Sequence, residues 1–338
     1  MKKINILTCA MVALTMACTN NDEQENVPNN YPTDNIIRVT AGVSNPITRG
    51  GETGTPGLSA YTGDFMLTVV NVANNKYTYA NKLFTYAGAT GWNCSETLLW
   101  QNAATPVKIA AVAPYDAKYE VYTYTNRECP FQYHLNSNQT TTDPKNDLLH
   151  YFNNNFTPKD DLNSDGKLQL TLNHAFCLFD INITLGTEFN TATGLSADPV
   201  ASATISGIYN HANIDVWDNP VKVNVITDGV WGNRENIIAT PGAFTSVTNE
   251  KENAKKQFSC IVLPQTLSKD HFVVTLQTTT GTGTVKKYEW SPTADITIES
   301  GKKYTLNLSL GDNKLVLNGG GITANAWGDE NRKSIETD

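Results

Sequence analysis

The chain has 338 residues, a formal net charge of −8 at pH 7 and a pI near 5.2. An acidic surface repels nucleic-acid phosphates, so the composition argues against general nucleic-acid binding and we expect no nucleic-acid partner. Beyond the N-terminal segments described next, about 300 residues remain, a length that favours two domains over one.

The N-terminus has the pattern of a secretory signal. Lysines precede an apolar run over residues 6–17, which is shorter than the roughly 18 to 20 residues needed to cross a bilayer. Ala17 stands directly before Cys18, an arrangement that resembles a lipobox, although Thr15 occupies a position where an apolar residue is usual. We predict a lipoprotein signal peptide over 1–18 with an acylated cysteine; the alternative is an ordinary secretory signal that is cut nearby.

Residues 19–35 are rich in Asn and carboxylates and have almost nothing apolar to bury. Such a segment stays disordered, so we predict a tether between the lipid anchor and the folded body. Acidic residues just after a lipidated cysteine also resemble an address for the outer face of the outer membrane, the alternative being plain linker solubility.

Beyond the tether, apolar and polar residues alternate between clusters of Gly, Asn, Asp and Pro, and helical periodicity is nearly absent. This pattern is typical of antiparallel strands with one face in water, and it predicts an all-β fold built from β-sandwiches. The clearest predicted strands are 36–43, 65–72, 76–86, 107–113, 120–125, 168–185, 221–226, 258–263, 272–278, 285–290 and 303–310.

The run 168–185 alternates at both ends and is nearly all apolar near its middle. It predicts one long strand buried on both faces at its centre, or two strands with a kink at Asn173-His174. Composition shifts toward Thr, Gly, Ser, Ala and Asp across 186–199, which suggests a domain boundary. We therefore expect sandwiches at 36–190 and 191–330, followed by a tail at 331–338.

One segment resembles part of a calcium loop. Asp161, Asn163 and Asp165 match its oxygen-bearing positions and Gly166 its turn, but Leu172 stands where a bidentate Glu belongs. A polar turn is the favoured interpretation, with calcium binding as the minority hypothesis. The five histidines are scattered, and no nucleophile, zinc or phosphate motif occurs, so we predict no enzyme and no cofactor.

Cysteines and tryptophans favour packing roles. No Cys-x-x-Cys pair occurs among the four cysteines beyond the tether, which are Cys94, Cys129, Cys177 and Cys260. The last two lie in apolar runs, which predicts that they are buried free thiols. Six tryptophans leave room for a sugar-stacking platform, although core and interface packing is the preferred interpretation.

Several short segments occur in a recognisable order. They are Ile47-Thr48-Arg49-Gly50 after an early strand, 107–115, Asp147-Leu148-Leu149, 170–175, Leu263-Pro264-Gln265, 301–308 and a closing 322–327. Together they resemble the fimbrillin (Mfa-like) family of Gram-negative lipoprotein pilins over nearly the whole mature chain.

The resemblance implies two transthyretin-like antiparallel β-sandwich domains in tandem. In that family an arginine-directed protease removes the leader and first strand of polymerising subunits, and a strand from the next subunit fills the groove by β-augmentation. The resemblance places the cleavage at Arg49-Gly50 and makes 36–43 the displaced strand, with alternating side chains at Ile37, Val39, Ala41 and Val43.

The implied donor strand lies within 314–327, where Leu315, Leu317, Ile322 and Ala324 offer side chains to groove pockets. Gly319-Gly320-Gly321 interrupts this segment, and glycine weakens a strand, so a hinge or turn between two short strands is the competing expectation.

The expected function is that of a structural subunit or accessory component, as stalk, tip or anchor, of a surface fimbria assembled by donor-strand exchange. Its expected partners are other pilin subunits, the outer membrane through the lipid anchor before processing, and a host protein or glycan. The alternative is a surface lipoprotein that binds glycans through an aromatic platform.

Overall fold

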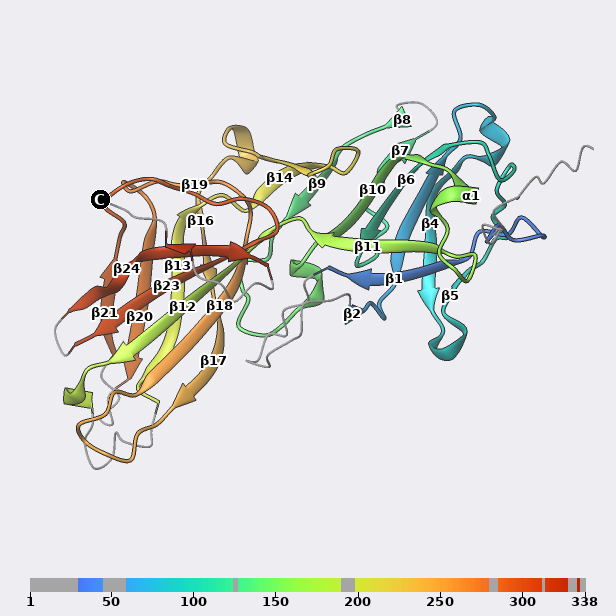
Figure 1. The fold of residues 1–338 in the computed structure, drawn as a ribbon. Helices are drawn as coiled ribbons and strands as arrows, with labels where there is room; N and C mark the ends of the chain where they lie inside the picture. The colour runs from blue at the N-terminus through green and yellow to red at the C-terminus, as the bar shows by residue number, and fades with distance from the viewer. Residues whose placement is uncertain are drawn as a thin grey trace, which may run out of the picture.

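A computed structural model of the chain describes residues 30–44, 59–123, 127–189, 198–279, 285–311, 314–327 and 333–334. The described part is almost entirely β, as predicted, and forms an elongated molecule with two β-rich halves (Figure 1). None of its helices is long and apolar enough to cross a bilayer. They are α1 (Pro158–Asp161) and the 3-10 turns η1 (Asn75–Tyr77), η2 (Gly88–Thr90), η3 (Pro144–Asn146), η4 (Thr187–Phe189) and η5 (Gly229–Trp231).

The N-terminal half contains a sheet with the strand order β2-β1-β11-β10-β6-β3-β4-β5. Its strands are β1 (Val39–Val43), β2 (Ser59–Ala60), β3 (Phe65–Val70), β4 (Tyr79–Tyr86), β5 (Trp92–Cys94), β6 (Val107–Ala113), β10 (Leu149–Phe156) and β11 (Leu168–His174). Every residue of β3 is buried, because Phe65 and Leu67 pack in one core while Met66 and Val70 pack in another. This double burial explains why β3 reads as a nearly continuous apolar run.

The C-terminal half is built from two sheets, visible on the left of Figure 1. The six-stranded sheet has the order β17-β18-β12-β23-β24-β25, and the four-stranded sheet has the order β16-β13-β20-β21. Apolar side chains from both sheets share one core. The strands are β12 (Cys177–Leu185), β13 (Val200–Ile208), β16 (Glu235–Ile238), β17 (Thr240–Thr245), β18 (Lys255–Val262), β20 (Val273–Thr279), β21 (Val285–Trp290), β23 (Lys302–Leu310), β24 (Leu315–Ala326) and β25 (Lys333–Ser334).

A third sheet joins the two halves. Its order is β15-β14-β9, made of β9 (Phe131–His134), β14 (His211–Asp215) and β15 (Lys222–Val225). The larger core continues across this junction, where Trp217 Nε1 donates a hydrogen bond to the Val121 carbonyl at 2.7 Å. Two small ribbons complete the described strands: β7 (Tyr122–Thr123) with β8 (Arg127–Glu128), and β19 (Thr266–Leu267) with β22 (Ile296–Thr297).

The division between the halves differs from the predicted boundary at 190/191. The run 168–185 forms two strands, and β12 pairs with β18 and β23 of the C-terminal half. The chain therefore changes sheets between β11 and β12, at Ala175-Phe176. The composition shift marks the loop after β12, whereas the change of sheets occurs inside a buried apolar segment that has no loop composition.

Candidate assembly site

β1 lies next to the edge of the N-terminal sheet. Its inner neighbour is β11, to which it is parallel, from Val39 opposite Leu168 to Val43 opposite Leu172. Its outer neighbour is β2, which pairs with it only at two positions. Withdrawal of β1 from the described fold would therefore disturb one full strand interface and leave the sheet beyond β11 in place.

The predicted displaced-strand residues share one face of the segment 37–43, which contains β1. Ile37, Val39 and Ala41 are buried, Val43 packs at the margin, and all four contact the N-terminal core. The neighbouring strand contributes Leu168, Leu170 and Leu172 to this core, each with no exposed surface. β1 thus packs its apolar side chains beside those of β11 in the same sheet, and its loss would expose part of these side chains and the backbone hydrogen-bonding groups at the edge of β11.

Backbone hydrogen bonds also join the residues on either side of β1 to the rest of the N-terminal half. The Ile37 N–H donates to the Leu98 carbonyl at 2.9 Å, and the Ser44 N–H donates to the Leu172 carbonyl at 2.8 Å. At the exposed start of the segment, Arg38 forms an ion pair with Asp34 and lowers the pKa of that carboxyl to about 2.

β24 holds the predicted donor residues and lies near the edge of the six-stranded sheet. It is antiparallel to β23 and is flanked on its other side by the two-residue strand β25. The pairing register shifts between Leu306 and Leu308, opposite the glycine segment. Gly319 and Gly321 both have positive φ, +68° and +92°, so the glycines form a bulge within one strand instead of the expected hinge or turn.

The bulge brings all four predicted donor residues to one face. Before the bulge, Leu315 lies opposite Leu310 and Leu317 opposite Leu308. After the bulge, Ile322 lies opposite Leu306 and Ala324 opposite Tyr304. Partners in an antiparallel pair point to the same side, and these four β23 residues are all buried in the core. In an unbroken strand, Leu317 and Ile322 would point to opposite faces because they are an odd number of residues apart.

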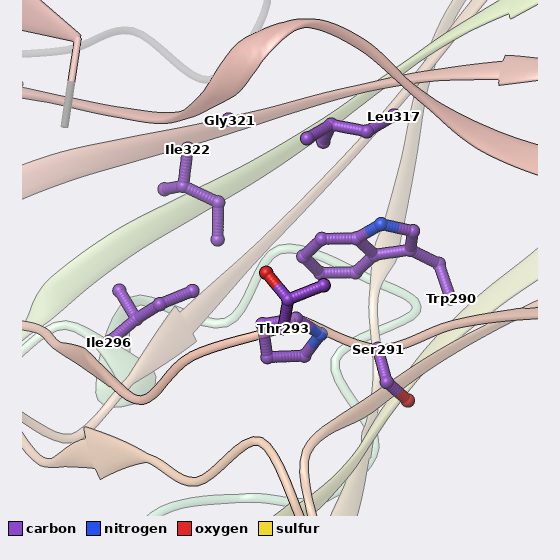
Figure 2. A pocket seen from close by; sticks show the side chains of 8 residues that line it. Trp290, Ser291, Thr293, Ile296, Leu317, Gly321 and Ile322 are labelled. Atoms are coloured by element: carbon purple, nitrogen blue, oxygen red, sulfur yellow. The ribbon is translucent and has the colours of Figure 1, made fainter. Parts of the chain in front are cut away.

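A pocket of about 260 Å³ opens beside this bulge. Leu317 and Ile322 line it from β24, and Trp290 with Ile296 lines it from the other side (Figure 2). Leu317 is 37% exposed, although Ile322 is almost completely buried. One of the predicted donor side chains is therefore only partly buried in its own sandwich.

The end of β24 reaches the end of β11. Trp327 stacks on His174 with ring centroids 3.8 Å apart and planes inclined by 2°. His174 Nδ1 lies 3.0 Å from Asp147 Oδ1, which fixes the orientation of the ring. The candidate donor strand thus ends against the strand that pairs with the candidate displaced strand.

The remaining predicted site residues have other positions. Cys18, Arg49 and Gly50 lie outside the described residues. In the proposed calcium loop, Asn163 Oδ1 accepts hydrogen bonds from the Asp165 and Lys167 N–H groups, and Asp161 Oδ2 accepts one from Thr157. These oxygens shape the turn before β11.

Three further groups of side chains bear on function. Cys177 and Cys260 are buried free thiols, and burial raises the pKa of Cys177 well above its ordinary value. Among the tryptophans, Trp231 is 51% exposed and the other five are buried or half-buried. The fold also brings His134, His211 and Glu235 together. Sequence spacing gave no signal for that cluster, because strand pairing creates it.

Comparison with known proteins gives one family and several related folds. The family described as fimbrillin-like matches residues 54–327. A protein named for cell adhesion from Bacteroides uniformis ATCC 8492 has a TM-score of 0.57 at 16% identity, covering 88% of this chain and 99% of its own. A similar one from Bacteroides ovatus ATCC 8483 has a TM-score of 0.58 at 12% identity, with coverages of 88% and 99%.

A fimbrial protein from Bacteroides vulgatus ATCC 8482 has a TM-score of 0.50 at 13% identity, covering 86% of this chain and 99% of its own. At these low sequence identities, the similarity to the three structures shows a shared fold. No curated protein matches the sequence.

Proposed function

Because this chain belongs to the fimbrillin-like family, we propose that it is a structural subunit or accessory component of a surface fimbria, assembled by donor-strand exchange after proteolytic trimming. The family match covers most of the chain, and one related structure is named as a fimbrial protein. A structural role also agrees with a described fold whose apolar clusters fill its sandwiches. Stalk, tip and anchor are all compatible with this proposal.

The proposed route to the surface begins with the N-terminal signal. Acylation of Cys18 anchors the precursor in the outer membrane, and residues 19–35 separate the folded body from the lipid. Proteolysis after Arg49 then releases the subunit from its anchor and detaches the segment that carries β1. Other pilin subunits, of this chain or of related ones, are the proposed partners.

The observation that carries the proposal is the position of β1. Its apolar side chains pack beside three completely buried leucines of β11, and among the described residues its outer neighbour is the two-residue strand β2. Burial of one leucine side chain contributes about 1.5–3 kcal/mol, so uncovering this face costs several kcal/mol. A donor strand with matching apolar side chains recovers that free energy and also satisfies the freed backbone groups of β11.

β24 is the proposed donor. Its four apolar side chains lie on one face because of the bulge, and within the described part of the chain its outer neighbour is the two-residue strand β25. To act in a neighbouring subunit it has to leave β23 and the stacking of Trp327 on His174. The exchange therefore replaces one set of backbone pairs by another, with the free energy of the uncovered acceptor groove as its driving force.

Limited proteolysis tests the proposal. Low-dose trypsin on the purified precursor is expected to cut after Arg49 and to yield a ladder of oligomers, read by intact mass and native gel. The R49A variant, treated identically, is expected to remain uncut at this position and monomeric. Cleavage after Arg38 provides an internal comparison with cleavage after Arg49, because the Arg38 guanidinium is paired with Asp34.

Two results would count against the proposal. Trimmed protein that stays monomeric at high concentration would remove the support for stalk polymerisation. Oligomers that form equally in R49A would show that association does not depend on release of β1.

A further inference from the structure

Two histidines face each other in the sheet that joins the halves. Antiparallel pairing of β9 and β14 places His134 opposite His211, and their rings stack with centroids 4.0 Å apart. Glu235, at the start of β16, reaches the same point. One ligand atom from each of the three residues lies within 4.8 Å of the others. Three strands thus bring two imidazoles and one carboxylate close together.

Asn210 determines which nitrogen of His211 is available. Its Oδ1 accepts a hydrogen bond from His211 Nδ1 at 2.8 Å, which leaves the lone pair on Nε2. His211 is 7% exposed, and within the described part of the chain its Nε2 has no hydrogen-bond partner. A buried acceptor without a partner is costly, and a bound cation would remove that cost.

The Asn210 amide marks the centre of the cluster. Its Nδ2 donates hydrogen bonds to Glu235 Oε2 at 2.6 Å and to His134 Nε2 at 3.2 Å. The same N–H₂ group also lies within hydrogen-bond distance of Ser137 Oγ and the Leu135 carbonyl, so His134 Nε2 and Glu235 Oε2 are two of several acceptors gathered around one point. A tetrahedral ion with bonds of 2.0–2.1 Å separates its ligand atoms by about 3.3 Å. Binding therefore draws the three side chains together, while Asn210 Oδ1 keeps its hydrogen bond from His211 Nδ1 and Asn210 Nδ2 keeps the Leu135 carbonyl and Ser137 Oγ as acceptors.

The cluster has a route from solvent. His134 is exposed and Glu235 is half-buried, so both can move toward an entering ion. The ring centroid of Trp231 lies 4.6 Å from that of His211, so this side chain flanks the cluster.

We propose that His134, His211 and Glu235 bind Zn²⁺ and that the ion links the two halves of the molecule. Two imidazole nitrogens and one carboxylate oxygen suit zinc, and three protein ligands leave a fourth position for water. The His134 ligand comes from β9 of the N-terminal half, whereas the other two come from strands of the C-terminal half. The ion thus stiffens the junction through which a fibre subunit transmits tension.

Isothermal titration calorimetry, with ZnCl₂ added to the EDTA-treated full chain, tests this proposal. One equivalent is expected to bind, and H134Q and E235Q are each expected to weaken binding at least tenfold. Both substitutions fall on residues with exposed surface, so the fold should persist, and circular dichroism checks this. H271Q is the matched control, because His271 is exposed and lies outside the cluster.

A second readout distinguishes this site from thiol binding. Titration with Co²⁺ is expected to give the visible bands of a four-coordinate ion without the thiolate charge-transfer band that Cys94 or Cys129 would produce. Zn²⁺ is expected to raise the Tm of the parent chain and of H271Q, but not of H134Q or E235Q. The proposal is overturned if no stoichiometric Zn²⁺ binds, or if H134Q and E235Q bind it as tightly as the parent.

Discussion

His150 in β10 is a buried basic residue whose environment keeps it neutral. It is 4% exposed, and burial, with a smaller contribution from His174, lowers its pKa to about 4. In the unfolded chain a histidine titrates near pH 6.5, so between about pH 6.5 and 4 the unfolded state binds more protons than the folded state. Stability is therefore expected to fall as the pH falls through this window, by about 3 kcal/mol for this group.

The H150L variant isolates this contribution. Urea unfolding at pH 7.5 and pH 4.5 is expected to show a smaller loss of stability for H150L than for the parent chain, whatever its stability at pH 7.5. H271Q, altered at an exposed histidine, is expected to follow the parent. If H150L loses as much stability as the parent, protonation of His150 has no part in the acid sensitivity.

Burial of single residues was predictable where the local pattern carried the information. Cys177 and Cys260 lie in apolar runs and are buried, as expected. The pairing of His134 with His211 was not predictable, because it depends on the register between two strands far apart in the sequence.

At the scale of single elements, the glycine bulge of β24 permits a direct test. Gly319 has φ of +68° and open space around the position of a Cβ atom, so the only obstacle to a side chain there is backbone conformation. The G319A substitution is expected to destabilise the fold by about 1 kcal/mol, because L-residues disfavour the left-handed region.

G319N is the matched variant, since asparagine tolerates this conformation better, and its loss is expected to be smaller. The difference in stability is measured from the urea unfolding midpoints of the parent chain, G319A and G319N, provided that their m-values are equal. A G319A chain as stable as the parent would mean that the bulge does not require positive φ at this position.

Most elements were predictable because their alternation is local. Each of the eleven predicted strand runs contains or overlaps an observed strand. The bulge was not predictable as such, since three glycines fit a hinge, a turn or a bulge equally well, and only the register against β23 separates them. The boundary predicted at 190/191 rests on composition, which identifies loops, whereas the sheet that β12 joins depends on its pairing partners.

At the scale of the whole molecule, the two halves share a core. The larger cluster contains residues of β3 and β6 together with residues of β12, β18 and β23. β9 and β14 connect the halves through four residue pairs. A length that favours two domains therefore does not imply two independent folding units here, and we expect both halves to unfold in one cooperative transition.

Ile214 allows that expectation to be tested. It has no exposed surface, belongs to the shared core, and lies in β14 opposite Phe131 of β9. The I214A variant is expected to lose about 2–5 kcal/mol of stability, the usual cost of such a cavity. Hydrogen exchange followed by mass spectrometry is expected to show equal losses of protection in β6 of one half and β18 of the other, because both open only by global unfolding.

N224A in the adjacent strand β15 is the control for the hydrogen-exchange comparison. Asn224 is exposed, so its replacement is expected to change stability by less than about 0.5 kcal/mol. If I214A weakened β18 while β6 kept the protection of the parent, the halves would be separate cooperative units. Tension along a fibre would then be resisted at the junction by the β9–β14 pairs and the side chains around them, and not by the fold as a whole.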